Sequence, residues 1–215
     1  MLQLLSTTGG IASTNAYLLF DTDTNQAILF DAPDHTIAPL LDEAEKRNLQ
    51  LLGLYLTHGH FDHIADHHLF STRHPAAQIL IHALDHPKLQ NPNSTSFILP
   101  FTIPPGQATA VLTDNQQLTL GAHPIHVLHT PGHSPGHVMF HFPGDHLLIG
   151  GDLIIGNSVG RTDLPDSSEP DLFTSIQRVM KLPPETTLLP GHGHPSTLAQ
   201  ERDTNPYVQL ALSQH

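Results

Sequence analysis

Short apolar runs separated by polar turn residues make up the first third of the chain and predict strands. Residues 16–21 (AYLLFD) and 27–31 (AILFD) are typical of a β-hairpin. From Ile37 to Ala44, apolar side chains recur at i, i+3, i+4 and i+7, which predicts an amphipathic helix of about three turns. Residues 51–57 (LLGLYLT) are almost continuously apolar and end in a polar loop, so they predict a buried strand.

The rest of the chain continues this pattern of short strands, with one clear amphipathic helix over Asp171–Lys181 and a terminal helix starting near Ser196. The further predicted strands are residues 78–82, 117–120, 125–129, 137–142, 146–149 and 187–189. The spacing from 117 to 149 favours an antiparallel sheet, and residues 91–106, rich in Pro, Asn and Ser, predict a surface loop. Grouped strands with helices outside them indicate an α/β (α+β) fold of two packed sheets.

Composition narrows the classes of partner and cofactor. The chain has 215 residues, with 8 Lys and Arg against 20 Asp and Glu, a formal charge of −12. Phosphate binding needs clustered basic residues, so this balance argues against nucleic acid as a partner. The sequence has no Cys, which excludes disulfides, Cys-ligated zinc, iron–sulfur clusters and a Cys nucleophile. Any transition metal must therefore bind to His and carboxylate side chains.

Targeting and membrane segments are not apparent in the sequence. The first residues, MLQLLSTTGG, lack the basic and long apolar regions of a signal peptide. No apolar run reaches the ~18 residues of a membrane span. We therefore expect a cytoplasmic protein with no membrane partner, and its oligomeric state stays open.

Histidine is unusually abundant, with 19 residues, and most of them are interpreted as surface substitutions. The segment THGHFDH (57–63) stands out because it follows the predicted buried strand. His58 and His60 flank Gly59 on extended backbone, so both imidazoles can point the same way, and Asp62 and His63 come next. Four potential nitrogen and oxygen ligands within six residues suit Zn²⁺, Fe or Mn²⁺. A His-rich chain also produces such a cluster by chance.

Three further segments place a potential ligand directly after a predicted strand: His133 in TPGHSPGH, Asp152 in GGD and His192 in PGHG. Taken alone, each also fits an ordinary turn. Because loops after strands converge at a sheet edge, we expect these residues to meet the first segment. They divide into two sets that share Asp152, whose two oxygens can bridge two ions. One set is His58, His60 and His133; the other is Asp62, His63 and His192.

These four segments resemble the metallo-β-lactamase superfamily, and the likeness extends over almost the whole chain from Asn15-Ala16-Tyr17 onward. Residues 160–163 (GRTD) and 201–206 (ERDTNP) are similar to short bacterial hydrolases of the type II glyoxalase kind. The resemblance implies an αββα four-layer sandwich over residues 1–215, with the site at the edge of the two sheets. It also implies two divalent ions, zinc first with iron or manganese as alternatives, bridged by Asp152 and a hydroxide.

The resemblance implies a hydrolase that attacks a thioester or ester carbonyl with this hydroxide, S-lactoylglutathione being the favoured substrate. Asp62 would orient the hydroxide and accept its proton. A leaving thiolate with a pKa near 8.5 needs little acid assistance. Asp31 matches an Asp that supports the metal loop, and His137 is a weaker candidate of the same kind. Arg161 is a candidate substrate anchor, with a structural ion pair to Asp163 as the alternative.

Two other functions stay open at this point. A persulfide dioxygenase, which the chain also resembles, would hold one Fe(II) on His58, His133 and Asp152. A non-catalytic His-rich protein would bind many ions weakly and turn over nothing. A secreted β-lactamase is less favoured, because an export signal and the Cys of common second sites are missing. Only 23 residues follow His192, so we expect no C-terminal glutathione-binding helical domain.

Overall fold

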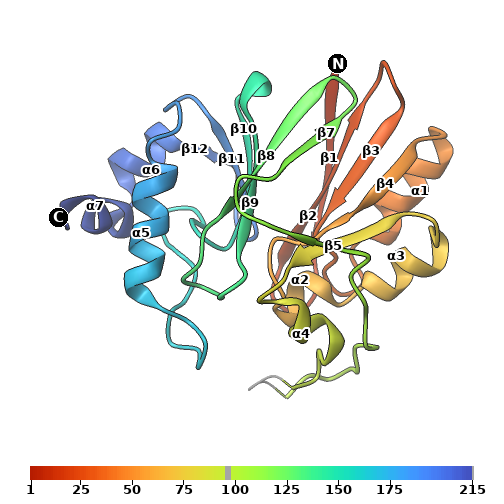
Figure 1. Ribbon diagram of the computed structural model, residues 1–215, viewed down its shortest axis with the longest axis horizontal. Coiled ribbons are helices and arrows are strands. Elements are labelled where there is room, and N and C mark those ends of the chain that lie inside the picture. Colours follow the sequence, from red (N-terminus) through yellow and green to blue (C-terminus); the bar gives the residue numbers. More distant parts are fainter. Residues whose placement is uncertain (95–97, 215) are drawn as a thin grey trace.

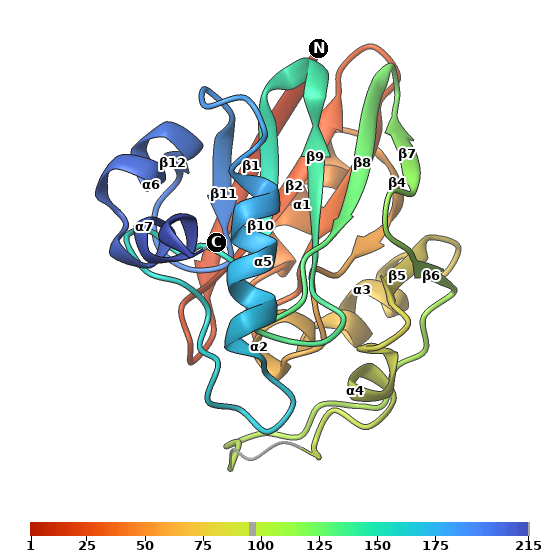
Figure 2. The same cartoon turned by 60° about the vertical axis from the view of Figure 1, so that its left-hand side comes forward.

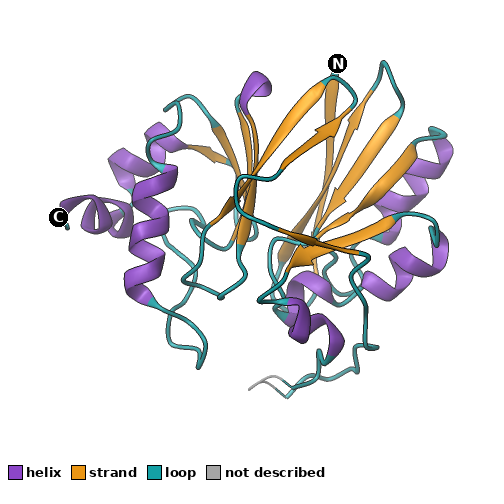
Figure 3. Cartoon of the chain, viewed as in Figure 1, coloured by secondary structure: helices purple, strands orange, loops and turns teal. Residues whose placement is uncertain are grey.

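Two six-stranded sheets pack face to face, and helices cover the outer side of each (Figure 1). The structure is a computed structural model and describes residues 1–94 and 98–214. Figure 3 shows the resulting four layers of helix, sheet, sheet and helix. The predicted αββα sandwich is therefore confirmed.

The first sheet has the strand order β1-β2-β3-β4-β5-β6. Its strands are β1 (Leu2–Gly9), β2 (Thr14–Asp21), β3 (Gln26–Phe30), β4 (Gln50–Tyr55), β5 (Gln78–His82) and β6 (Ala110–Leu112). The first three pair in antiparallel fashion, and β3 to β6 pair in parallel. The carboxyl ends of β3, β4 and β5 therefore lie at the same edge of the sheet.

The second sheet has the order β12-β11-β10-β9-β8-β7. Its strands are β7 (Gln117–Leu120), β8 (His123–His129), β9 (Val138–Phe142), β10 (Leu147–Gly151), β11 (Thr187–Pro190) and β12 (Ser196–Thr197). The run β7 to β10 is antiparallel, as predicted, whereas β10 and β11 are parallel. The ends of β10 and β11 thus meet at one edge, next to the loop that joins β8 to β9.

Helices α1 (Ala38–Lys46), α2 (Phe61–Ile64), α3 (His67–Arg73) and α4 (His86–Gln90) accompany the first sheet, and α5 (Glu169–Val179), α6 (Leu198–Thr204) and α7 (Pro206–Ser213) accompany the second (Figure 2). A short 3-10 turn, η1 (Pro143–Asp145), joins β9 to β10. Ser168 caps α5 through its hydroxyl, and Asn205 separates α6 from α7. Within the described residues, no helix has the length and hydropathy that crossing a bilayer requires.

The core between the sheets is built on aromatic and aliphatic side chains from both of them. The Phe30 ring of β3 packs against Phe140 and Phe142 of β9, with ring centroids 5.0 and 6.2 Å apart. Tyr55 closes the cluster at 5.9 Å from Phe30. Burying this apolar surface fixes the two sheets against one another and so fixes where their edge loops meet.

The sequence pattern missed some elements. β1 and β6 were not predicted, because β1 is an edge strand with no fully buried residue and β6 has only three residues. The short helices α3 and α4 were not predicted either. The predicted loop 91–106 has no helix or strand in its described parts, and its residues 95–97 lie outside the described residues.

Candidate metal centre

Loops from both sheets converge at one edge of the sandwich. The segment after β4 runs into α2 and carries four of the predicted ligands, while the β8–β9 loop, the end of β10 and the end of β11 carry the other three. In Figure 1, α2 lies between the lower ends of the two sheets. The structure brings all seven predicted ligand residues together: His58, His60, Asp62, His63, His133, Asp152 and His192.

Three imidazoles form the first predicted set. His60 Nδ1 lies 3.1 Å from His58 Nε2 and 2.8 Å from His133 Nε2. His58 is fully buried, and His133 is nearly so. One ring nitrogen from each of the three histidines thus lies within 4.8 Å of the other two.

The second predicted set combines a carboxylate with two imidazoles. His63 Nε2 lies 3.6 Å from Asp62 Oδ2, and His192 Nε2 lies 3.3 Å from the same oxygen. Asp152 joins the two sets, since its Oδ2 lies 3.5 Å from His133 Nε2 and 3.2 Å from His192 Nε2. Its Oδ1 lies 3.4 Å from His63 Nε2. The carboxylate of Asp152 therefore lies between the two groups.

These separations fit metal ligands. Ligands about 2.0–2.1 Å from one tetrahedral ion are about 3.3 Å apart, which is close to the distances within each set. Six buried side-chain atoms of the described residues have no hydrogen-bond partner, and His63 Nε2 and Asp152 Oδ1 are two of them. Buried polar atoms normally have one, so these two atoms are compatible with a missing cation.

Hydrogen bonds to the opposite ring nitrogens prepare the imidazoles for metal. Thr57 Oγ1 lies 3.1 Å from His58 Nδ1, and the Arg161 carbonyl oxygen lies 2.9 Å from His133 Nδ1. The hydroxyl of Thr57 is committed to Asp31, so its oxygen accepts from His58 Nδ1–H. With Nδ1 protonated, Nε2 of His58 and of His133 keeps its lone pair for a ligand bond.

Four histidines of the site fall into two groups, one with a lowered pKa and one with a raised pKa. Desolvation, reinforced by neighbouring imidazoles, lowers the pKa of His58 and brings the pKa of His60 to about 3, so both rings stay neutral. Desolvation also acts on His63 and His192, but carboxylates outweigh it. Asp152, Asp31 and Asp62 raise the pKa of His63. Positive charge thus gathers between the carboxylates, where a cation would lie.

Asp31 and His137 are not in the two ligand sets, but they form hydrogen bonds to residues that are. Asp31 Oδ2 accepts from His63 Nδ1 at 2.8 Å, and its carboxylate also accepts from the backbone N–H and hydroxyl of Thr57 at 2.8 Å each. His137 Nε2 accepts from the backbone N–H of Asp152 at 2.9 Å, and its Nδ1 lies 2.9 Å from Thr130 Oγ1. Asp31 therefore fixes His63, and His137 fixes the backbone of Asp152.

The family model described as the metallo-beta-lactamase superfamily matches residues 9–192, most of the chain. The chain belongs to this superfamily. One relative is the probable metallo-hydrolase YqgX of Bacillus subtilis. It is 31% identical to this chain over 205 residues, which cover 93% of this chain and 94% of YqgX. A hydroxyacylglutathione hydrolase of Fuscovulum blasticum is 28% identical over 235 residues, covering 93% of this chain and 84% of its own length.

Solved structures agree with this placement in the metallo-beta-lactamase superfamily. The BLEG-1 B3 metallo-beta-lactamase superposes with a TM-score of 0.86 at 32% identity, over 97% of this chain and 99% of that one. The protein TTHA1623, solved in a di-iron-bound form, superposes with a TM-score of 0.84 at 35% identity, over 94% and 99% of the two chains. The chain thus carries the fold of a metallo-hydrolase superfamily, together with His and Asp groups that could hold metal.

A hollow lies over the candidate metal centre, and Arg161 is one of its lining residues. Its empty volume, together with the open solvent at its mouth, is about 600 Å³. The Arg161 side chain is 51% exposed and forms a two-pronged ion pair with Asp163, with N–O distances of 2.6 and 2.7 Å. The alternative of a structural ion pair is therefore present in the structure. The role of Arg161 as a substrate anchor stays a prediction.

Asp85 is a buried residue that sequence reasoning missed. Its Oδ2 accepts from the backbone N–H of Gly59 at 2.8 Å and from Ser134 Oγ at 2.7 Å, and its Oδ1 accepts from the backbone N–H of Gly136 at 2.9 Å. Lys88 Nζ lies 3.1 Å from the same Oδ1. One carboxylate therefore ties the loop of His58 and His60 to the loop of His133. In the sequence, an Asp two residues before Pro87 at the start of a helix indicates only a helix N-cap.

Residues of β2 hold the loop of His192, which the sequence pattern did not reveal. Asn15 Nδ2 donates to the carbonyl oxygens of Pro190 and Gly193 at 3.0 and 2.9 Å, and Tyr17 Oη donates to Pro190 at 2.7 Å. Thr14 Oγ1 donates to Asp62 Oδ2 at 2.9 Å. The first sheet thus positions ligands carried by both sheets.

Proposed function

We propose that this protein is a dinuclear metal-dependent hydrolase of thioesters or esters, of the type II glyoxalase kind, with S-lactoylglutathione as the first substrate to test. The observation that carries the proposal is the pair of ligand sets joined by Asp152. Two bound divalent ions would supply Lewis acidity and a hydroxide nucleophile near neutral pH. The di-iron form of TTHA1623 supports a two-ion centre and leaves the choice between zinc and iron to analysis.

Hydrolysis of a thioester breaks the acyl C–S bond, forms a C–O bond from water and releases a carboxylate and a thiol. Within the chain, Asp62 is suited to orient the attacking water, because His63 and His192 outweigh its desolvation and hold its pKa at about 2. An ionised carboxylate accepts hydrogen bonds, and Thr14 fixes Oδ2 in place by donating to it.

The surroundings of the site favour a leaving group that needs no proton. Beside the predicted ligands, the charged side chains that line the hollow and its neighbour are Arg161, Lys88 and Asp166, and all three are engaged in ion pairs. A thiolate leaves without a general acid, whereas an amine leaving group requires one. This chemistry supports a thioester over a peptide.

The first experiment is metal analysis of protein purified without added metal, followed by an S-lactoylglutathione hydrolysis assay. We expect about two tightly held ions per chain and turnover that depends on them. His60→Ala and His192→Ala should each lose bound metal and reduce kcat/KM by at least about a hundredfold. His194→Ala, an exposed histidine two residues from His192, is the matched control and should change neither quantity. Many weakly held ions without turnover would contradict the proposal.

β-Lactam hydrolysis is a second candidate function, favoured by the similarity to the BLEG-1 B3 metallo-beta-lactamase. The chromogenic cephalosporin nitrocefin tests it on the same metal-loaded protein. Turnover of nitrocefin without turnover of thioesters would replace the thioester proposal. Oxygen uptake with glutathione persulfide, together with one iron per chain, would instead identify a persulfide dioxygenase.

A further inference from the structure

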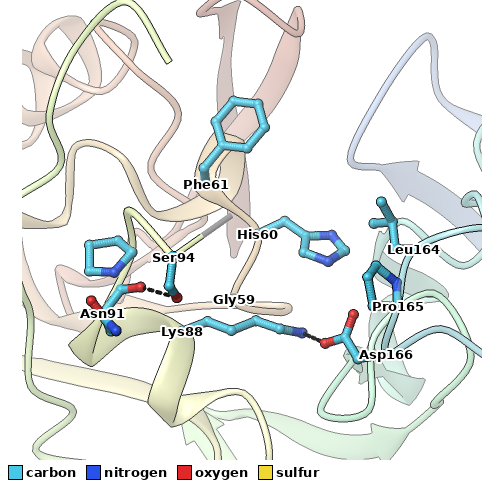
Figure 4. Close-up of a pocket in the computed structure, with 10 residues that line it drawn as sticks. Gly59, His60, Phe61, Lys88, Asn91, Ser94, Leu164, Pro165 and Asp166 are labelled. Atoms are coloured by element: carbon cyan, nitrogen blue, oxygen red, sulfur yellow. Dashed lines mark hydrogen bonds and ion pairs between the residues drawn. The ribbon is translucent and has the colours of Figure 1, made fainter. Parts of the chain in front are cut away.

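A second hollow opens beside the candidate metal centre, and we call it the side pocket. Its empty volume is about 650 Å³ when the open solvent at its mouth is included. The side pocket shares His60, Phe61 and Leu164 with the hollow over the centre, so the two hollows lie side by side. Figure 4 shows the side pocket between α4 and the segment of Leu164, Pro165 and Asp166. The side pocket is therefore within reach of a group that projects from a substrate at the centre, past His60 and Leu164.

The charged groups at the side pocket carry more negative than positive charge. Lys88 Nζ lies 2.6 Å from Asp166 Oδ2, the ion pair drawn in Figure 4. It also lies 3.1 Å from the buried Asp85 Oδ1, so two carboxylates face one ammonium. No other Lys or Arg is among its lining residues in the described chain. A carboxylate or phosphate of a ligand would meet a cation that is already compensated, and desolvating it there is unfavourable.

The remaining walls are mostly apolar. Phe61, Pro92, Leu164 and Pro165 present carbon surface, and Ser94 Oγ is occupied by donating to the Asn91 carbonyl oxygen at 2.7 Å. Burying an apolar group against such walls is favourable in proportion to the area removed from water. The side pocket thus matches an uncharged, largely apolar group.

We propose that the side pocket binds the acyl arm of the substrate and selects uncharged aliphatic or aromatic acyl groups larger than lactoyl. This inference rests on the proposed thioester hydrolysis. A thiol carrier of the glutathione type bears carboxylates, which the compensated side pocket disfavours. The carrier arm therefore lies in the more open hollow on the Arg161 side, where its charges stay in water.

Chain length of the acyl group tests the proposal directly. Acetyl, butanoyl and hexanoyl thioesters of one small neutral thiol, N-acetylcysteamine, are compared on the metal-loaded protein. We expect kcat/KM to rise roughly fourfold for each added methylene, the factor for burying one such group. A flat or falling series would overturn the proposal.

Filling the side pocket provides the variant test. Ser94 is exposed and lines the pocket, so Ser94→Trp adds a large side chain at the pocket without replacing a core residue. We expect this variant to flatten the chain-length series. Thr174→Trp, on the exposed face of α5, is the matched control and should retain the full series. An unchanged series in Ser94→Trp would contradict the assignment.

Charge provides an independent variant test. Asp166→Asn leaves Lys88 with Asp85 alone and makes the pocket neutral. We expect the ratio of kcat/KM for a glutaryl thioester to that for a pentanoyl thioester to rise about threefold, in line with one partly exposed ion pair. Asp171→Asn, an exposed carboxylate on α5, is the control and should leave the ratio unchanged. No change in Asp166→Asn would count against the acyl assignment.

A binding measurement separates this proposal from the proposed function. Ketone analogues, in which CH₂ replaces the thioester sulfur, are not hydrolysed, and calorimetry measures their affinity without turnover. Affinity that rises with acyl length and falls in Ser94→Trp supports the side pocket even where no thioester is hydrolysed. Thioester turnover with no length dependence in either rate or affinity overturns the side pocket and leaves the hydrolase proposal standing.

Discussion

At the scale of single residues, the site depends on a few buried carboxylates, each with several donors. Asp31 holds His63 and Thr57 while its own backbone has a left-handed φ of 58°. Asp85 is fully buried and accepts from two backbone N–H groups, one hydroxyl and one ammonium. Neither side chain needs to touch a metal ion. Their role is to hold the loops that carry the ligands.

Replacing Asp85 should be costly for stability. Asp85→Ala leaves the N–H groups of Gly59 and Gly136 and the Ser134 hydroxyl buried without an acceptor. We expect the free energy of unfolding to fall by about 3 kcal/mol, measured by urea denaturation of the metal-free protein. Asp163→Ala, which removes an exposed partner of Arg161, is the control and should change it by less than about 1 kcal/mol. Equal effects of the two variants would contradict this role.

The same residue predicts a pH dependence. Burial alone raises the pKa of Asp85, but the Lys88 ammonium and the bonds from Ser134 and Gly59 outweigh it, so the pKa lies below its ordinary value. The stabilisation is then complete above the unfolded pKa of about 3.9 and is lost as pH falls through the folded pKa. We expect the stability difference between the native protein and Asp85→Ala to shrink below about pH 4, as measured by urea denaturation at stepped pH. A difference that grows on acidification would refute this sign.

At the scale of elements, parallel pairing of β10 with β11 brings Asp152 and His192 to one edge. The register shifts between Ile149 and Gly151, where Gly151 adopts φ 49° and lets the chain turn into Asp152. Gly191 donates its N–H to the Gly151 carbonyl oxygen at 2.7 Å. A methyl group on Gly191 would overlap Asp152 Oδ1 and approach His63 Cε1. The absence of a side chain at Gly191 is therefore a requirement of the site.

Gly191→Ala should damage the second ligand set while keeping the fold. We expect metal affinity at the set of Asp62, His63 and His192 to fall at least tenfold, since misplaced supporting groups cost about that much. Metal content after dialysis against a chelator measures this. Gly144→Ala is the matched control, because a methyl group there meets nothing within 4 Å. Full metal retention in Gly191→Ala would show that the site tolerates the displacement.

At the scale of the whole molecule, the candidate centre links the two halves of the sandwich. Ligands from the segment after β4 belong to the first sheet, while His133, Asp152 and His192 follow strands of the second. Ions held between them would act as cross-links in addition to the shared aromatic core. Metal binding should therefore stabilise the folded state of the entire chain.

Metal removal tests this linkage. An ion at a free concentration of about 100 Kd adds about 2.7 kcal/mol. For a chain of this length we then expect Tm to rise by about 5–10 °C on adding Zn²⁺ to the metal-free protein, measured by calorimetry. His192→Ala should show a smaller rise, and His194→Ala the full one. An identical Tm with and without metal would contradict a centre that spans both sheets.

The sequence by itself determined the ligand types, the absence of Cys ligands and the central strands. His58, His60, Asp62 and His63 lie within six residues, so local spacing on a strand-to-helix loop nearly fixes their relation. β2, a central strand, is buried at every residue, and its middle, residues 16–20, is a continuous apolar run. These features depend on neighbours in the chain, which a sequence displays directly.

Only the tertiary structure determined which distant residues hold the ligand loops and where the side pocket lies. Asp85 is 26 residues from Gly59 and 49 from Ser134, and Asn15 is 175 from Pro190, so their hydrogen bonds exist only once both sheets have packed. The side pocket likewise needs α4 beside the segment of Leu164 and Asp166. Long-range contacts of this kind leave no periodic trace, because they are set by the packing of the core and not by local conformational preference.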